Sequence, residues 1–171
     1  MFDCSSDEIK QIIADLQNGK SSDIPIKVIK RSSNIISPIL AKYYNILMEE
    51  GIFPDVSKTA KVTPIYKKDD AELLENYRPI STLPIFGKIF EKIIFGKLYT
   101  HLLENNLLSK NRSGFRPGDF TINQLLSIPT EIYNYFETID ETRAVFLDIS
   151  KAFDKVWHEG LCFKLKQNGI K

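Results

Sequence analysis

A run of four apolar residues, Ala144 to Leu147, leads directly into a carboxylate at Asp148. An unbroken apolar run of this length is typical of a strand that is buried on both faces. This run constrains the fold more than any other segment, because such a strand needs structure on both of its sides. We therefore expect Asp148 to stand at the carboxyl end of a buried strand.

Helical periodicity predicts several helices around this strand. The first follows Ser5 and Glu8, which have the spacing of a capping box. A second helix is expected to begin near Ser33 or Ser37 and to end at Gly51. The other expected helices run from Pro84 to about residue 102, from Thr121 onward with a kink or break at Pro129, and, as a helix or turn, from Ser150 onward.

Two further strands are predicted between these helices. Residues 60–66 alternate between apolar and polar side chains, and residues 77–83 form a second short extended run. Pro64 has no N–H to donate to a ladder, so the first strand is expected at an edge of its sheet. The order of helices, paired short strands, helices and a buried strand predicts an α+β fold.

The charge distribution excludes a chain that binds nucleic acid by bulk charge alone. The 171 residues carry a net charge of +1, whereas residues 61–120 carry +3. The positive residues gather in two acid-free runs: Lys58, Lys61, Lys67 and Lys68, and Lys110, Arg112 and Arg116. No apolar run is long enough for a membrane span, and we expect no secretory signal, because the N-terminus turns acidic at once. The widely spaced Cys4 and Cys162 are expected to be reduced thiols in an intracellular protein.

Asp148 is the first candidate for metal binding. Mg²⁺ prefers a few hard oxygen ligands, such as one or two carboxylates, together with the phosphates of its substrate. On the pattern alone, a cap or turn residue is the simpler interpretation of Asp148. Asp154 and His158 lie four residues apart and could hydrogen-bond on a helix. That interpretation is simpler than a metal site that also includes Glu159.

Three stretches in order resemble the motifs of one family. Residues 144–158 resemble the first catalytic motif of reverse transcriptases, specifically those of non-LTR (LINE-type) retrotransposons. Residues 62–68, followed by 76–81, resemble the fingers motif of that family, and residues 113–118 resemble its next motif. Residues 51–54 are typical of the segment that leads into such domains.

The resemblance implies a fold and an activity. The fold would be the fingers and the start of the palm of a right-hand polymerase, with a helical lead-in over residues 1–58 and the reverse transcriptase domain over 59–171. The activity would be that of an RNA-directed DNA polymerase, which uses an RNA template, a DNA primer and deoxynucleoside triphosphates. In such polymerases two Mg²⁺ ions assist nucleotidyl transfer.

The resemblance also assigns roles around the first catalytic motif. Asp148 matches the first catalytic, metal-binding aspartate, and the backbone carbonyl of Ile149 would be a further metal ligand. Phe153 matches the bulky residue that packs under the incoming sugar and excludes a ribose 2′-hydroxyl. A buried core phenylalanine is the competing interpretation of Phe153.

Basic residues upstream receive roles in the same way. Lys67 or Lys68, and Arg78, match the residues near the triphosphate; without the resemblance they would be interpreted as a solvated turn. Arg116 either belongs to the template-side surface or supports the fold there. Arg holds phosphate oxygens bidentately, while Lys acts as a point charge.

Departures from the family pattern limit the expected activity. Phe120 occupies a position that is usually polar, and Pro129 falls inside a helix. The Tyr-x-Asp-Asp hairpin is absent, since the sole Asp-Asp pair, Asp69-Asp70, lies upstream of Asp148. We therefore expect a domain truncated before the paired-Asp hairpin and inactive as an isolated chain, so that its status as an enzyme stays open.

The alternative is a non-catalytic nucleic-acid-binding or interaction remnant of a transposable element, whose RNA binding would survive Asp148→Ala.

Overall fold

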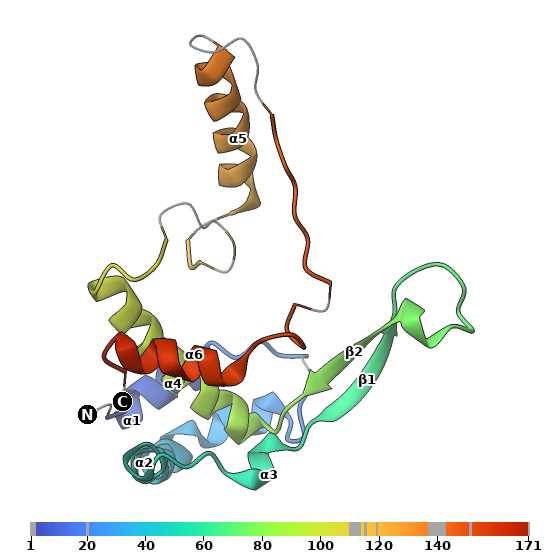
Figure 1. Cartoon of the computed structure of the whole chain (residues 1–171). Helices are drawn as coiled ribbons and strands as arrows, with labels where there is room; N and C mark the ends of the chain where they lie inside the picture. Colours follow the sequence, from blue (N-terminus) through green and yellow to red (C-terminus); the bar gives the residue numbers. More distant parts are fainter. Residues whose placement is uncertain are drawn as a thin grey trace. The chain divides into compact units, whose positions relative to one another are not determined.

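The chain forms two compact units, Met1–Thr100 and His101–Lys171. The structure is a computed structural model that describes residues 3–19, 21–109, 114, 116–118, 120–136, 143–150 and 152–170. Figure 1 follows the chain through both units. Each unit is considered by itself below. None of the helices in the described ranges has the length and apolar character needed to cross a membrane.

Helix α1, Ser6–Ala14, begins as its sequence predicts. The Ser5 hydroxyl accepts a hydrogen bond from the backbone N–H of Glu8 at 3.1 Å, which satisfies one free donor of the first turn. The Glu8 carboxylate accepts a hydrogen bond at 3.1 Å from Nζ of Lys97, which lies in helix α4, Ile85–Glu104. Ser5 therefore caps α1 as predicted, while the Glu8 side chain, the other half of the predicted capping box, ties α1 to α4.

Helix α2, Ile26–Glu50, ends where it was predicted to end and begins earlier. Gly51 follows it in the left-handed conformation, with φ at +68°, and its N–H donates to the carbonyl of Leu47. The predicted start near Ser33 or Ser37 is wrong.

Tertiary packing explains this early start. Pro38 lies inside α2 and removes one backbone hydrogen bond, at a cost of about 3 kcal/mol. Ile26 and Ile29 are both buried in the core of the first unit. Burial of two isoleucine side chains offsets a cost of that size, so the helix extends on both sides of the proline.

A two-stranded hairpin follows the short helix α3, Asp55–Lys58. Strands β1, Lys61–Tyr66, and β2, Tyr77–Thr82, pair antiparallel, and the short 3₁₀ helix η1, Leu74–Asn76, lies in the loop between them. Figure 1 shows the hairpin leading away from α3 toward this loop. The predicted pair of strands is confirmed.

Two prolines protect the edges of this hairpin. Pro64 lies directly opposite Pro79. The next ladder bond, from the N–H of Lys67 to the carbonyl of Asn76 at 2.8 Å, makes odd-numbered residues of β1 the hydrogen-bonded partners. Pro64 and Pro79 therefore occupy positions at which a backbone N–H would point away from the partner strand. Because proline has no N–H, the outer edges of β1 and β2 offer no donor to an added strand at these two positions.

The core of the first unit lies between α1, α2 and the first half of α4, Ile85–Glu104. The ring of Tyr44 stacks on that of Phe90, with centroids 4.9 Å apart, and its hydroxyl donates to the carbonyl of Phe86 at 2.8 Å. The carboxylate of Asp23 accepts from the backbone N–H of Ile85 at 2.8 Å and so caps α4 across a long sequence separation. These contacts fix the start of α4, directly after the hairpin.

The second unit contains α5, Thr121–Phe136, and α6, His158–Gln167. Helix α5 continues through Pro129, so the predicted break does not occur there. A proline removes only one i to i−4 bond, and the Thr130 hydroxyl donates to the carbonyl of Leu126 at 2.8 Å beside it.

The predicted buried strand is wrong in this structure. Residues 143–149 are extended without forming a strand, and Val145, Phe146 and Leu147 are 81, 85 and 91% exposed. A strand buried on both faces needs neighbouring strands and a layer on each side. Within the described ranges the only sheet is the β1–β2 hairpin, which belongs to the first unit. The mixed helix-and-sheet character of the fold is confirmed.

Candidate functional site

The register of the hairpin places its positive charges on one face. Residues directly opposite in an antiparallel pair share a face, and alternate residues along each strand do so as well. Ile65 lies opposite Arg78, and the ladder continues with Lys67 opposite Asn76. Lys67 and Arg78 are therefore diagonal neighbours on the same face, on the order of 7–8 Å apart at the backbone.

We call this surface the basic face. Its members alternate along the two strands and the first residue beyond each: Lys61, Thr63, Ile65 and Lys67, and Asn76, Arg78, Ile80 and Thr82. It holds three cationic side chains and no carboxylate. Such a surface can bind phosphate groups, because Arg donates two parallel hydrogen bonds while Lys supplies a mobile positive charge.

Lys68 lies beyond this face, in the loop that joins the strands. Its Nζ lies 4.0 Å from a carboxylate oxygen of the adjacent Asp69, and both side chains are exposed. This loop position distinguishes two adjacent lysines that the sequence left equivalent. Of the two, only Lys67 shares the face with Arg78.

Two tyrosines close the loop from the opposite face of the hairpin. Tyr66 and Tyr77 are register partners with ring centroids 5.6 Å apart. The Tyr66 hydroxyl donates to the carbonyl of Asp69, and the Tyr77 hydroxyl donates to the carbonyl of Ala71 at 2.9 Å. Side chains on the uncharged face thus hold the backbone of the loop that follows Lys67.

Asp70 organises the centre of the same loop. Its carboxylate accepts from the backbone N–H of Glu72 at 2.9 Å, and its carbonyl accepts from the side-chain amide of Asn76 at 2.7 Å. Asp69 beside it adopts a left-handed φ of +69°, a conformation that Asp tolerates better than most residues. Sequence reasoning missed these positioning residues, although a tyrosine on each side of an Asp-rich turn was a usable signal.

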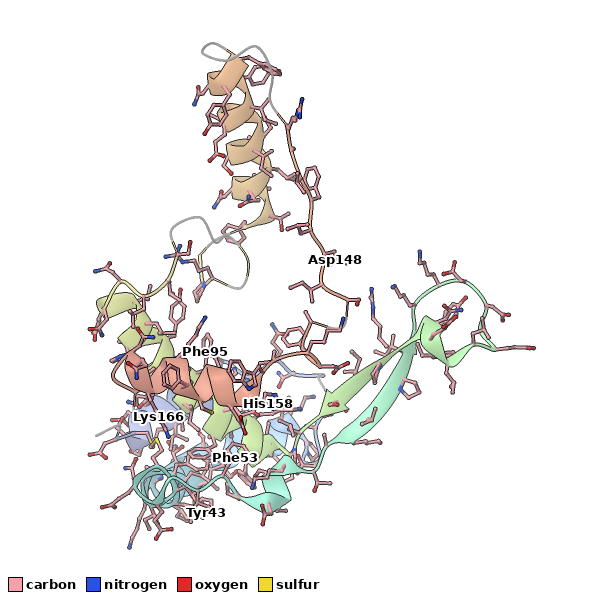
Figure 2. The ribbon with its side chains drawn as sticks, viewed as in Figure 1. Tyr43, Phe53, Phe95, Asp148, His158 and Lys166 are labelled. Atoms are coloured by element: carbon pink, nitrogen blue, oxygen red, sulfur yellow. The ribbon has the colours of Figure 1, made fainter. Side chains whose placement is uncertain are left out.

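The second set of predicted residues lies in the second unit. Figure 2 shows Asp148 on the extended segment. Ile149 and Phe153 are 67 and 83% exposed, so Phe153 is not a core residue in this structure. The turn after Asp148 is shaped by a hydrogen bond from Nζ of Lys155 to the Ser150 hydroxyl at 3.1 Å. The rigid strand that was expected to carry Asp148 is not formed.

No complete metal site is formed by the part of the chain that the structure describes. Within it, no three His, Cys, Asp or Glu residues are grouped so that they could hold an ion. Mg²⁺ requires several oxygen ligands, and Asp148 by itself supplies one carboxylate. Asp154 and His158 do not share a helix, because α6 begins at His158, so the i,i+4 pair predicted for them is wrong.

Arg116 is half-buried and lies directly before a turn at residues 117–118 of the second unit. Gly118 beside it has a φ of +80°, a left-handed conformation that favours glycine. Within the motif at residues 113–118, Ser113 and Phe115 lie outside the described residues, as do Asp119 after it and the basic residues Lys110 and Arg112 before it.

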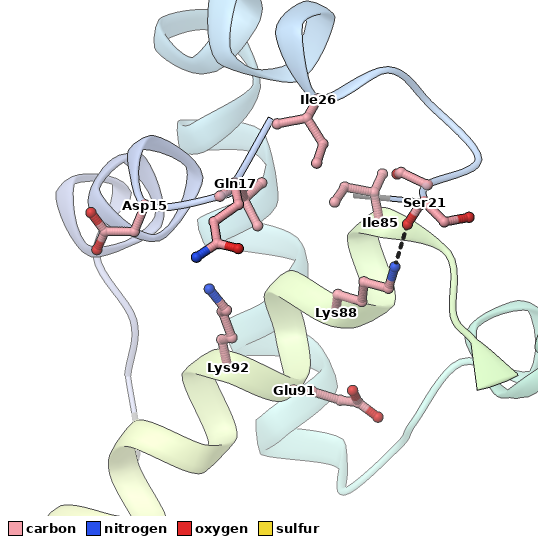
Figure 3. A pocket seen from close by; sticks show the side chains of 10 residues that line it. Asp15, Gln17, Ser21, Ile26, Ile85, Lys88, Glu91 and Lys92 are labelled. Carbon is pink, nitrogen blue, oxygen red and sulfur yellow. Dashed lines mark hydrogen bonds between the residues drawn. The ribbon is translucent and has the colours of Figure 1, made fainter. Parts of the chain in front are cut away.

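A cavity of about 380 Å³ lies between the end of α1 and helix α4. Figure 3 shows its lining, including the hydrogen bond from Nζ of Lys88 to the carbonyl of Ser21 at 3.0 Å. The cations Lys88 and Lys92 are balanced by the carboxylates of Asp15 and Glu91. The cavity therefore has no excess positive charge, and the basic face is the better candidate for an anionic ligand.

Comparison with known families identifies a match over most of the chain. The model of the family described as reverse transcriptase (RNA-dependent DNA polymerase) matches residues 65–171. The match begins within β1 and includes Lys67, Arg78 and Asp148.

Curated relatives from Drosophila melanogaster match the same chain. The probable RNA-directed DNA polymerase from transposon BS is 36% identical over 129 residues, which are 75% of this chain and 14% of the relative. The RNA-directed DNA polymerase from mobile element jockey is 32% identical over 165 residues, covering 94% of this chain and 18% of the relative. A third, the probable RNA-directed DNA polymerase from transposon X-element, is 28% identical over 167 residues, with the same two coverages. The chain thus spans less than a fifth of the length of these relatives.

Proposed function

This chain belongs to the reverse transcriptase (RNA-dependent DNA polymerase) family, and on that premise we propose that it works as part of the RNA-directed DNA polymerase of a non-LTR retrotransposon. Its substrates are an RNA template, a DNA primer and deoxynucleoside triphosphates. The observation that carries the proposal is the position of Lys67 and Arg78 on one face of the hairpin.

The basic face binds the triphosphate of the incoming nucleotide. Three of its residues, Lys61, Lys67 and Arg78, are cationic, and no carboxylate on the face competes with a phosphate for them. The hydroxyls of Tyr66 and Tyr77 hold the loop between β1 and β2 through hydrogen bonds to its carbonyls. Because this loop is already held, nucleotide binding loses little conformational entropy there. In polymerase terms the hairpin belongs to the fingers, and the segment around Asp148 belongs to the palm.

Residues of the second unit complete the proposal. Asp148 is the first metal-binding carboxylate, and the carbonyl of Ile149 is a further ligand. Phe153 packs against the sugar of the nucleotide, and Arg116 faces the template. The family match includes all four positions, and the exposed side chains of Ile149 and Phe153 leave them accessible.

Magnesium is the metal proposed for this family member. One carboxylate cannot position the two ions that this type of phosphoryl transfer employs. We therefore expect the 171 residues by themselves not to extend a primer on an RNA template with Mg²⁺ or Mn²⁺. Extension that is abolished by Asp148→Ala would contradict this expectation.

Binding of a fluorescent deoxynucleoside triphosphate to the full chain tests the basic face. We expect Lys67→Ala and Arg78→Ala each to raise the dissociation constant about tenfold, which corresponds to about 1.4 kcal/mol. The matched control is Lys68→Ala, which removes the same charge from the loop one residue away and should change the constant less than twofold. Equal effects of Lys67→Ala and Lys68→Ala would refute the assignment, because they would show a response to charge without regard to position.

A further inference from the structure

Helix α2 carries apolar side chains on its core face and also on a second face that is exposed. One face supplies core residues such as Ile29, Leu40 and Tyr44. The other face, which we call the outer stripe, is between 44 and 72% exposed and consists of Val28, Ile35, Ile39, Tyr43 and Ile46. A helix with two apolar faces is typical of one that packs on both sides.

The outer stripe has the spacing of a helix–helix seam. Val28 and Ile35 are seven residues apart, as are Ile39 and Ile46, and the two pairs are separated by four residues. These spacings place Val28 and Ile35 at d positions and Ile39 and Ile46 at a positions of one heptad repeat, in which Ser32 and Lys42 occupy the intervening a and d positions. The seam runs along nearly the whole of α2, from its first turn to its last.

A shallow hollow of about 410 Å³ lies on the same face. Besides Pro38, its walls are Ile39, Lys42, Tyr43 and Ile46. These four positions are i, i+3, i+4 and i+7, the arrangement that forms the hole for a side chain of a second helix in knobs-into-holes packing. The surface is therefore shaped to receive a helix.

The charges on α2 indicate which helix fits. The exposed cations Lys27 and Arg31 lie in the first two turns, and the exposed carboxylates of Glu49 and Glu50 lie in the last turn. An antiparallel copy of α2 would bring each positive end beside a negative end, whereas a parallel copy would bring like charges together. The outer stripe is thus complementary to itself when reversed, as a two-fold symmetric interface requires.

We propose that two copies of this chain dimerise through the outer stripes of α2, packed antiparallel. The interface lies on the side of α2 away from the core, and it uses none of the residues assigned to the basic face. Dimerisation and nucleotide binding are therefore separable by mutation.

Sedimentation equilibrium of the full chain over a range of concentrations tests the dimer. We expect a monomer–dimer equilibrium whose dissociation constant rises at least tenfold in the double variant Ile35→Lys/Ile39→Lys, or about 1.4 kcal/mol. The matched control is Leu125→Lys/Leu126→Lys, which places the same charges on the equally exposed helix α5. Far-UV circular dichroism of both variants should match that of the original chain, because all four positions are exposed.

Two outcomes would overturn the dimer. One is a monomer at every concentration. The other is self-association that persists in the α2 variant and disappears in the α5 variant, because the chain would then associate through its second unit.

Disulfide trapping tests the orientation without relying on a disruptive substitution. In a Cys162→Ser background, Arg31→Cys and Glu49→Cys chains are made separately and mixed under mild oxidation; the remaining Cys4 is buried. Antiparallel packing predicts that the mixed 31–49 disulfide forms faster than either self-pair. Faster formation of the 31–31 and 49–49 disulfides would refute the antiparallel arrangement.

Discussion

Two phenylalanines of α4 provide a strict test of how the first unit packs. Phe90 is 2% exposed and Phe95 is 55% exposed, although both lie on the same helix within the same unit. Phe90 contacts the rings of Tyr44 and Phe53, with centroids 4.9 and 5.5 Å away, while Phe95 stacks on Tyr99 at 5.6 Å. Figure 2 labels Phe53 and Phe95.

The structure predicts very different costs for the two alanine substitutions. Phe90→Ala should lower the free energy of unfolding by about 3–5 kcal/mol, because it leaves a cavity in the core. Phe95→Ala should cost about 1 kcal/mol or less, because it removes one exposed ring pair worth roughly 0.5–1.5 kcal/mol and gains helix propensity. The same propensity gain applies to both variants and cancels in their difference.

Urea unfolding followed by far-UV circular dichroism measures this difference. With a slope of about 1–3 kcal/mol per molar urea, a difference of about 3 kcal/mol separates the two midpoints by about 1–3 M. If Phe90→Ala does not fold, Phe90→Leu is used instead, because leucine retains most of the apolar volume. Phe90→Leu should fold and should unfold at a lower urea concentration than Phe95→Ala. Equal midpoints for the two alanine variants would refute the packing of Phe90 into the core, against Tyr44 of α2 and against Phe53, because that packing distinguishes the two positions.

Two further predictions concern titratable groups. Burial raises the pKa of the Cys4 thiol, so a thiol reagent at pH 8 should modify the exposed Cys162 quickly and Cys4 slowly; two equally fast thiols in the folded chain would contradict this. Burial also raises the pKa of Tyr44 above its usual value of about 10. Above pH 10 the unfolded state therefore loses this proton before the folded state does, and stability falls as the pH rises. Tyr44→Phe should cost about 1 kcal/mol at pH 7 and should flatten the decline in unfolding free energy between pH 10 and 12; an unchanged decline would exclude Tyr44 as its source.

Local sequence signals predicted the elements that depend on near neighbours. The cap at Ser5, the end of α2 at Gly51 and the two strands of the hairpin are all confirmed, because each is decided by contacts within a few residues or one turn. The family, too, was readable from three motifs in order, since a motif is a property of the sequence itself.

Predictions that depended on distant partners were wrong or incomplete. The run that ends at Asp148 has the composition of a buried strand, but burial is decided by whether other strands and layers surround it. The start of α2 was misplaced because the prediction used local start signals, whereas the core that buries Ile26 and Ile29 is not visible in the sequence. Both errors come from judging a segment without its environment.

The sequence by itself determined the family, the position of the basic residues along the chain and the local caps, turns and strands. Only the tertiary structure decided that Lys67 rather than Lys68 shares a face with Arg78, because a face is defined by the register of two paired strands. It likewise decided that α2 presents a second apolar stripe, because exposure depends on which side of a helix the core occupies. Local periodicity specifies an element, and packing specifies which of its sides is left for function.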